Sequence, residues 1–149
     1  MAWAWMIEAL GRIGERFAVG AIVPVGCGST VGLVDGEELV LPVMDYEAVP
    51  PPDTVAGYAA LEPPFEEVYA PTNPAAMTLA RQLFWLQTAF PEAFAKARHI
   101  LFHPQYWAWR LCGAAACEVT SIGAQTHLWN PVEGRLSALA HRQGWAGLL

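Results

Sequence analysis

The sequence predicts an α/β fold in one domain over residues 1–149, with a central sheet, a β-hairpin and flanking helices. Three observations support this prediction: an amphipathic helical pattern at the start, an apolar run followed by a hairpin signal, and a series of helical patterns in the second half. Hydrophobic residues make up 54% of the chain and charged residues 15%. Such a chain must bury much apolar surface or expose some of it to a partner.

The first element is an amphipathic helix predicted over residues 3–17, where apolar side chains recur at helical spacing. The uncharged run over residues 18–26 is typical of a strand that is buried on both faces of a sheet. A strand at 31–34, a turn at Asp35-Gly36 and a second strand at 38–44 form the predicted hairpin.

Residues 48–74 are rich in proline, which predicts a long loop without regular elements over most of its length. Helical patterns then return. Helices are predicted over residues 75–90, 91–98 and 104–111 and from Ser137 to Gly144, with a short strand at 100–102 and a small, polar, β-tolerant stretch at 114–129. Gly113 is the expected C-cap of the helix at 104–111.

Composition excludes several classes of partner. The net charge is −6, with no basic stripe, so the sequence argues against nucleic-acid binding. Residues 17–34 carry no charge, but Pro24 and several glycines interrupt them, which argues against a membrane span. The N-terminus lacks the pattern of a signal peptide. Three cysteines without a disulfide framework favour a cytoplasmic location.

Several motifs, taken in order, resemble the FGGY family of carbohydrate kinases. The resemblance lies in the following segments: Ala21 to Ser29, Leu33 to Asp35, Ile100 to Gly113, Glu118 to Ser121 and Gln125 to Asn130. The family shows a similar order of an apolar strand, a proline, a helix with an Arg-Leu-x-Gly end, a Thr/Ser-rich stretch and a Leu-aromatic-Asp/Asn. The match spans most of the chain, although each motif is short.

The resemblance implies an incomplete actin-like ATPase, or ribonuclease-H-like, domain that is the N-terminal, sugar-binding part of such a kinase. Family members use ATP and Mg²⁺ to phosphorylate a sugar or polyol hydroxyl. Their Asp-x-Gly-Thr phosphate hairpin and catalytic Asp have no counterpart here, so both ends of the chain are expected to be cut. We therefore expect no catalytic residue, no bound cofactor and no activity from this segment alone. The expected partners are a sugar or polyol and either a second domain or another copy of the chain.

The resemblance also points to substrate-binding residues. Cys27 occupies the substrate loop, where many members carry Gln or His, and Gln125 lies where close relatives tend to carry His. Asp45, Tyr46 and Glu47 follow the hairpin, and carboxylates beside an aromatic ring suit a polyol. Thr120 could line the same cleft, although polar side chains of this stretch, Ser121 and Thr126 among them, more often satisfy local backbone groups.

Other patterns are interpreted structurally. His99 with His103, and Cys112 with Cys117, lack the ligand number and spacing of a zinc site. Cys27 has no identifiable base, so it is not a predicted nucleophile. The tryptophans are expected in the core or at an interface.

An alternative function remains open: a non-catalytic binding or assembly module derived from the same domain. The kinase interpretation depends on the region of Ile22 being a central sheet strand flanked by the Asp35-Gly36 hairpin.

Overall fold

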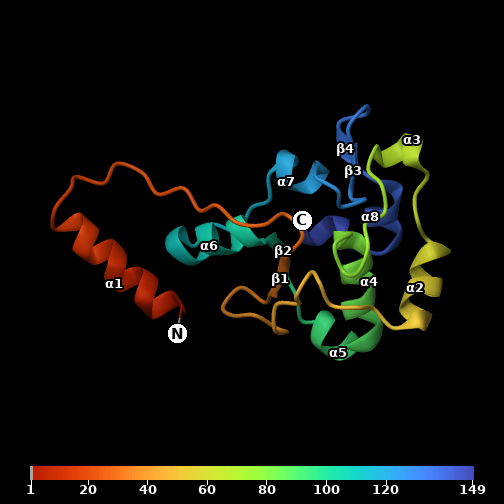
Figure 1. The fold of residues 1–149 in the computed structure, drawn as a ribbon, viewed down its shortest axis with the longest axis horizontal. Helices are drawn as coiled ribbons and strands as arrows, with labels where there is room; N and C mark the ends of the chain where they lie inside the picture. Colours follow the sequence, from red (N-terminus) through yellow and green to blue (C-terminus); the bar gives the residue numbers. More distant parts are fainter. Residues whose placement is uncertain (1) are drawn as a thin grey trace.

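The computed structural model describes residues 2–149 as a small α/β fold (Figure 1). The helices are α1 (Ala2–Gly14), α2 (Pro52–Ala59), α3 (Phe65–Val68), α4 (Leu79–Ala89), α5 (Pro91–Phe94), α6 (His103–Cys112), α7 (Val119–Gly123) and α8 (Ala138–Arg142), followed by a 3₁₀ turn (Ala146–Leu148). The strands are β1 (Val31–Val34), β2 (His99–Phe102), β3 (Trp129–Asn130) and β4 (Arg135–Leu136).

The strands form two small antiparallel sheets. β1 pairs with β2, with Val31 opposite Phe102 and Val34 opposite His99, and β3 pairs with β4. All four residues of β1 are buried, as are the last three of β2. The α/β class is therefore confirmed, but the sheet that contains β1 has two strands rather than the larger central sheet expected from the sequence.

The core forms where β1 and β2 meet α4 and the C-terminal segments. Its buried side chains come from all parts of the chain after residue 30, and include Leu33, Leu79, Leu83, Ile100, Phe102, Leu128, Leu139 and Trp145. α4 supplies an apolar face at helical spacing, which removes these side chains from water against the sheet. This packing holds the first turns of α4 and α6 beside the loop that leads into β1.

The hairpin prediction is confirmed only in part. Gly36 has a φ of 109°, and Asp35 Oδ1 accepts hydrogen bonds from the backbone N–H groups of Glu37 and Glu38, so the turn forms as expected. After the turn, one bridge joins Leu39 to Val34, and no strand continues through 44. Pro42 has no N–H to donate to a ladder, which accounts for the early end.

The prediction of a strand around Ile22 is wrong for this structure. Residues 18–26 are extended but are not part of a sheet, and Figure 1 shows them as a long connection between α1 and β1. Within residues 2–149 no neighbouring strand runs alongside them, so their apolar side chains are largely exposed. The apolar character of the run is that of a buried strand, but a strand also requires a partner.

α1 confirms the N-terminal helix, which ends at Gly14 rather than near Phe17. None of its residues is buried, so the other described residues cover its apolar stripe only in part. One end of α1 contacts α6: the rings of Trp3 and Trp107 stack with centroids 6.4 Å apart, and the Arg110 guanidinium lies 4.4 Å from the Trp3 ring centroid.

The proline-rich segment 48–74 contains two helices, so the expectation of no regular elements is wrong over α2 and α3. Pro51 is the N-cap of α2 and Pro52 its first residue, and Pro64 is the N-cap of α3. Proline is compatible with a first helical turn because the N–H it lacks would have no helical partner there. The prolines therefore begin these helices instead of breaking them.

The later elements follow the prediction more closely. The bounds of α4 and α5 lie within four residues of those expected, and the bounds of β2 and α6 lie within one. Gly113 ends α6 with a φ of 77°. Ser137 Oγ accepts the Ala140 N–H and caps α8. The stretch 114–129, expected to tolerate β structure, instead contains α7, because Glu118 caps this short helix. No helix within residues 2–149 is long and apolar enough to cross a bilayer.

Candidate functional site

A polar network surrounds residues 26–30, called loop 26–30 below, which lies between α4 and α6. On the α4 side, Gln82 is fully buried, and its Nε2 donates to Ser29 O at 3.2 Å and to Ala76 O at 3.1 Å. The Oε1 atom of the same side chain is buried without a hydrogen-bond partner. A buried acceptor left unpaired costs about 1–3 kcal/mol, which is unusual outside functional sites.

Arg81 lies beside Gln82 in the first turn of α4 and is only 7% exposed. One of its terminal nitrogens donates to the backbone carbonyls of Asn73 and Ala75, while its Nε is buried without a partner. No carboxylate within residues 2–149 forms an ion pair with this guanidinium. A buried cation with neutral partners leaves positive potential in this part of the protein.

On the α6 side, the backbone N–H of His103 donates to Thr30 O at 3.0 Å. Trp107 Nε1 donates to His103 Nε2 at 2.9 Å. Because indole N–H can only donate, Nε2 must be the unprotonated nitrogen of a neutral imidazole, and Nδ1 carries the proton. This Nδ1–H is buried without an acceptor and faces Gly26, where an added Cβ would lie 2.6 Å from Nδ1.

Gln105 completes this side of the network. Its Nε2 donates to Ser121 Oγ at 3.2 Å, and its Oε1 is buried without a partner. The buried side-chain nitrogen and oxygen atoms that lack partners within residues 2–149 therefore belong to the first turns of two helices, α4 and α6. Both turns are bonded to the same loop. The set contains two acceptors and two donors, which is the combination that hydroxyl groups satisfy, since each hydroxyl donates and accepts.

Two of the predicted site residues join this network. Cys27 is exposed on the loop, with its Sγ 2.9 Å from Thr30 Oγ1. Gln125 Oε1 accepts from Asn73 Nδ2 at 3.3 Å, which brings it to the segment that also binds Arg81. Gln125 has a positive φ of 58°, so its backbone is held in the left-handed region.

Of the residues that follow the hairpin, Tyr46 contacts the network, and it does so through its backbone carbonyl. Tyr46 O accepts the Ala76 N–H at 3.1 Å, next to the carbonyl that binds Gln82. Asp45 Oδ1 accepts the Glu47 N–H in a local turn, and both acidic side chains are exposed.

The hydrogen bond of Thr120 goes to a different part of the protein. Its Oγ1 donates to Glu118 at 2.6 Å, within the cap of α7. Ser121 also donates to Glu118 while it accepts from Gln105, and Thr126 Oγ1 donates to Ile122 O. Most of the polar groups in this stretch thus bind local partners.

The sequence interpretation did not select Arg81, Gln82, His103 or Gln105 as site residues. A signal was present for the first two, because they interrupt the apolar positions at 79, 80, 83 and 86 on the buried face of α4. The spacing of His99 and His103 argued against a metal site, and no group of three or more potential metal ligands occurs within residues 2–149.

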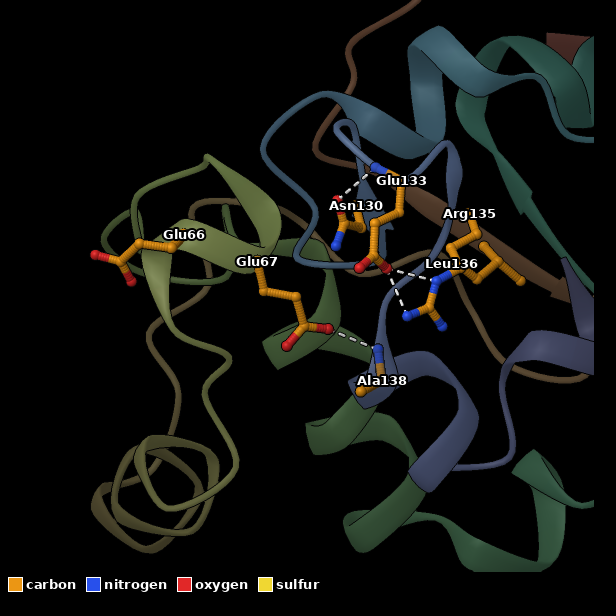
Figure 2. Close-up of a pocket in the computed structure, with 7 residues that line it drawn as sticks. All are labelled: Glu66, Glu67, Asn130, Glu133, Arg135, Leu136 and Ala138. Carbon is orange, nitrogen blue, oxygen red and sulfur yellow. Dashed lines mark hydrogen bonds and ion pairs between the residues drawn. The ribbon is translucent and has the colours of Figure 1, made fainter.

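A hollow of about 400 Å³ lies elsewhere, between α3 and the β3–β4 turn (Figure 2). Its polar groups bind one another: Glu67 Oε1 accepts the Ala138 N–H at 2.7 Å, and Glu133 pairs with Arg135. Figure 2 shows Glu66 pointing away from the other lining residues. The hollow thus leaves fewer groups for a ligand than the network at loop 26–30.

Comparison with known proteins bears on the whole chain. No protein-family model matches it, and no curated protein is similar enough to count as a relative. Among solved structures, it is similar to a carbohydrate kinase from Novosphingobium aromaticivorans, with 38% identity and a TM-score of 0.91. The chain resembles one region of a carbohydrate kinase. The similarity covers 97% of this chain and 31% of that kinase chain, so this chain spans about a third of the protein it matches.

Proposed function

We propose that this chain is the sugar-binding segment of an FGGY-type carbohydrate kinase, with the actin-like fold of that family, and that a sugar or polyol binds at loop 26–30. The observation that carries the proposal is the set of buried, unpartnered polar atoms on Gln82, His103 and Gln105, in the first turns of the two helices that are bonded to this loop. The kinase relation is not supported by a strand around Ile22, which the structure does not form, and depends instead on the 38% identity to a carbohydrate kinase over 97% of the chain. The same similarity supports the choice of a sugar as ligand.

Binding would pair the network with hydroxyl groups. The amide oxygens of Gln82 and Gln105 would each accept a hydroxyl proton, and His103 Nδ1–H would donate to a hydroxyl oxygen. Access requires displacement of loop 26–30. Cys27 and Gly28 lie in its exposed part, whereas Ser29 O and Thr30 O are hydrogen-bonded to Gln82 and His103, so displacement would break these bonds. Binding would replace unpaired buried groups with paired ones, which favours the complex.

The proposal assigns this chain no part in holding ATP or Mg²⁺. In the kinases that the chain resembles, ATP and Mg²⁺ act in the intact protein, where carboxylates and substrate phosphates hold the metal. Under this proposal, phosphoryl transfer depends on residues outside this segment. The three unpaired cysteines agree with a reducing cytoplasm as the proposed location.

The proposal is tested by titrating the chain with a panel of three- to seven-carbon polyols and ketoses, followed by amide NMR. We expect shifts at loop 26–30 and at the first turns of α4 and α6. Gln82→Met should weaken binding about tenfold or more, because it removes the acceptor while keeping the side chain's length. Gln87→Met is the matched control on the same helix, since Gln87 is bonded to Trp145 and Gln143 away from the loop. Thermal melts of both variants check that they fold.

Absence of shifts at loop 26–30 with every compound would contradict the proposal. Equal weakening by both Gln variants would also contradict it, because the effect would then come from general destabilisation of α4. The alternative function, an assembly module, is favoured by a separate observation, the exposed apolar surface of the N-terminal residues.

A further inference from the structure

Trp107 decides which nitrogen of His103 carries the proton. Its Nε1–H donates to His103 Nε2 at 2.9 Å, across one turn of α6. Two N–H groups cannot face each other at this distance, so the tautomer that is protonated on Nε2 is excluded while the bond is made. The proton is therefore on Nδ1, the buried nitrogen that faces Gly26 of loop 26–30.

The tautomer of His103 determines what the α6 side of the network recognises. With the proton on Nδ1, the ligand atom beside this nitrogen must accept a hydrogen bond, as a hydroxyl or carbonyl oxygen does. With the proton on Nε2, Nδ1 would be an acceptor. The unpartnered atoms of Gln82, His103 and Gln105 would then be three acceptors without a donor, which is a different pattern of recognition.

Trp107 is in turn packed against α1. Trp3, in the first turn of α1, stacks on the Trp107 ring, with the two rings 10° from parallel and their centroids 6.4 Å apart. The Tyr106 ring meets Trp107 edge-on, with centroids 5.3 Å apart. An indole packed in this way has less freedom to rotate, and the direction of its N–H group is restricted with it.

Arg110 strengthens the contact between the two helices. Its guanidinium lies 4.4 Å from the centroid of the Trp3 ring, and its Nη1 donates to the Tyr106 hydroxyl at 3.1 Å. A cation over the face of an indole ring is attracted by the ring's quadrupole. The aromatic and cationic contacts of Trp3 therefore join α1 to the helix that carries His103.

We propose that Trp107 is a positioning residue of the sugar site, which holds His103 as the Nδ1–H donor, and that Trp3 of α1 holds Trp107 in this role. This inference rests on the proposed function. Trp107 does not contact the ligand but acts through His103. The position of α1 thereby regulates the site, because displacement of α1 frees the Trp107 indole and lowers the fraction of His103 that can donate to a ligand.

The tautomer is measured without any ligand, by long-range proton–nitrogen NMR of the chain labelled with ¹⁵N-histidine at pH 8. His103→Gln assigns the signals. In the unmodified protein we expect a protonated Nδ1 and an unprotonated Nε2. Trp107→Phe keeps a ring for Trp3 but removes the donor, so the tautomer ratio should move about twofold or more towards Nε2–H. A protonated Nε2 in the unmodified protein, or an unchanged ratio in Trp107→Phe, would contradict the proposal.

A matched pair of variants at position 3 tests the contribution of α1. Trp3→Phe retains an aromatic ring and should leave the His103 signals close to those of the unmodified protein. Trp3→Ala removes the ring and should move the ratio in the same direction as Trp107→Phe. Trp129→Phe, at a half-buried position in β3, is the control and should leave His103 unchanged. Equal results for Phe and Ala at position 3 would contradict the role of α1. Thermal melts check that each variant folds, and the measurement on the unmodified protein needs no variant.

Polyol titration separates this inference from the proposed function. A polyol that binds the unmodified protein at loop 26–30 should bind Trp107→Phe about threefold or more weakly, because less of His103 is present as the donor. Unchanged polyol affinity in a variant whose tautomer ratio has moved contradicts the positioning role alone. Absence of polyol binding by the unmodified protein, with the expected tautomers present, contradicts the proposed function alone, since the tautomers are measured without ligand.

Discussion

His127 illustrates how a single buried side chain joins distant parts of this protein. Its Nδ1 lies 2.8 Å from the Tyr58 hydroxyl on α2, and its Nε2 lies 3.2 Å from Ala70 O. Because a carbonyl only accepts, Nε2 carries the proton and Nδ1 accepts from the tyrosine. Burial lowers the pKa of His127 and raises the pKa of Tyr58, so both groups are held neutral.

The first prediction concerns the pH dependence of stability. Below about pH 6.5, the ordinary pKa of histidine, the unfolded chain binds a proton at position 127 that the folded chain does not. The contribution of His127 to the free energy of unfolding should therefore be complete above this pH and decrease as the pH drops below it. His127→Asn, which tolerates the positive φ of 63°, should be about 1–3 kcal/mol less stable at pH 7.5.

Urea unfolding at pH 7.5 and 5.0 measures both effects. His127→Asn should show a smaller change between the two pH values than the unmodified protein. His141→Asn, at an exposed position, is the control and should retain the full change. An unchanged pH dependence in His127→Asn would show that another group governs it.

The second prediction, also at the residue scale, concerns Gly26. A Cβ at this position would lie 2.6 Å from His103 Nδ1, so Gly26→Ala forces the imidazole or the loop to move. We expect a loss of about 1–3 kcal/mol by chemical denaturation. Gly28→Ala, two residues along the same loop, meets nothing within 4 Å and should stay within about 0.5 kcal/mol of the unmodified protein. Equal costs at both positions would contradict the close contact between His103 and the loop.

Among the elements, α7 depends on one carboxylate. Glu118 accepts the N–H groups of Thr120 and Ser121 and also their hydroxyls. The bond from the Ser121 hydroxyl, followed by that from Thr120, lowers the pKa of Glu118 to about 2. The cap thus exists only while this group is ionised.

The third prediction is that Glu118→Ala unfolds α7 locally. A lost N-cap costs about 0.5–2 kcal/mol, and a five-residue helix has little else to hold it. Hydrogen exchange should accelerate at Ile122 and leave the α4 amides unchanged. In the unmodified protein the contribution of the cap is present above about pH 4.5 and is lost as the pH falls towards 2. Unaltered exchange at Ile122 would show that packing, not the cap, maintains α7.

Two segments show how a local sequence pattern can lead to a wrong structural prediction. The prolines at 51 and 52 predicted a loop, yet they occupy positions at a helix start where proline is favoured. Residues 18–26 predicted a buried strand because they are apolar and uncharged, but they have no neighbouring strand and are largely exposed. In both cases the outcome depended on the position of the segment relative to the rest of the chain.

For the molecule as a whole, folding separates three chemically identical thiols. Cys27 and Cys112 are exposed, whereas Cys117 packs beside the core and donates to Ile100 O at 3.0 Å. Burial raises the pKa of Cys117 to about 11. The thiolate is the reactive form, so this cysteine should be inert near neutral pH.

The fourth prediction follows from this difference. A disulfide reagent such as dithionitrobenzoate at pH 8 should modify two thiols rapidly and the third at least about tenfold more slowly. The third should react quickly in urea, because its protection depends on the fold. Assigning the slow thiol by Cys117→Ser provides the check. Rapid release of three equivalents from the folded protein would contradict the packing of α6 and β2 against the segment that carries Cys117.

The α/β class, the helices α1, α4, α5, α6 and α8, the strands β1 and β2, and the turn at Gly36 were predictable from the sequence. They depend on local properties such as helical spacing, caps and turn residues, which a chain carries in any context. The resemblance of segments such as residues 100–113 to carbohydrate kinases was likewise apparent from the amino-acid sequence. The structural comparison supports a kinase-like region.

The tertiary structure alone decided which polar groups meet. Loop 26–30, Gln82 and His103 are far apart in sequence, and the hydrogen bonds that join them were not predictable because they depend on how α4 and α6 pack on β1 and β2. The same holds for residues 18–25, whose apolar character is local but whose exposure is not. Local energies specify elements, whereas burial and pairing are properties of the assembled chain.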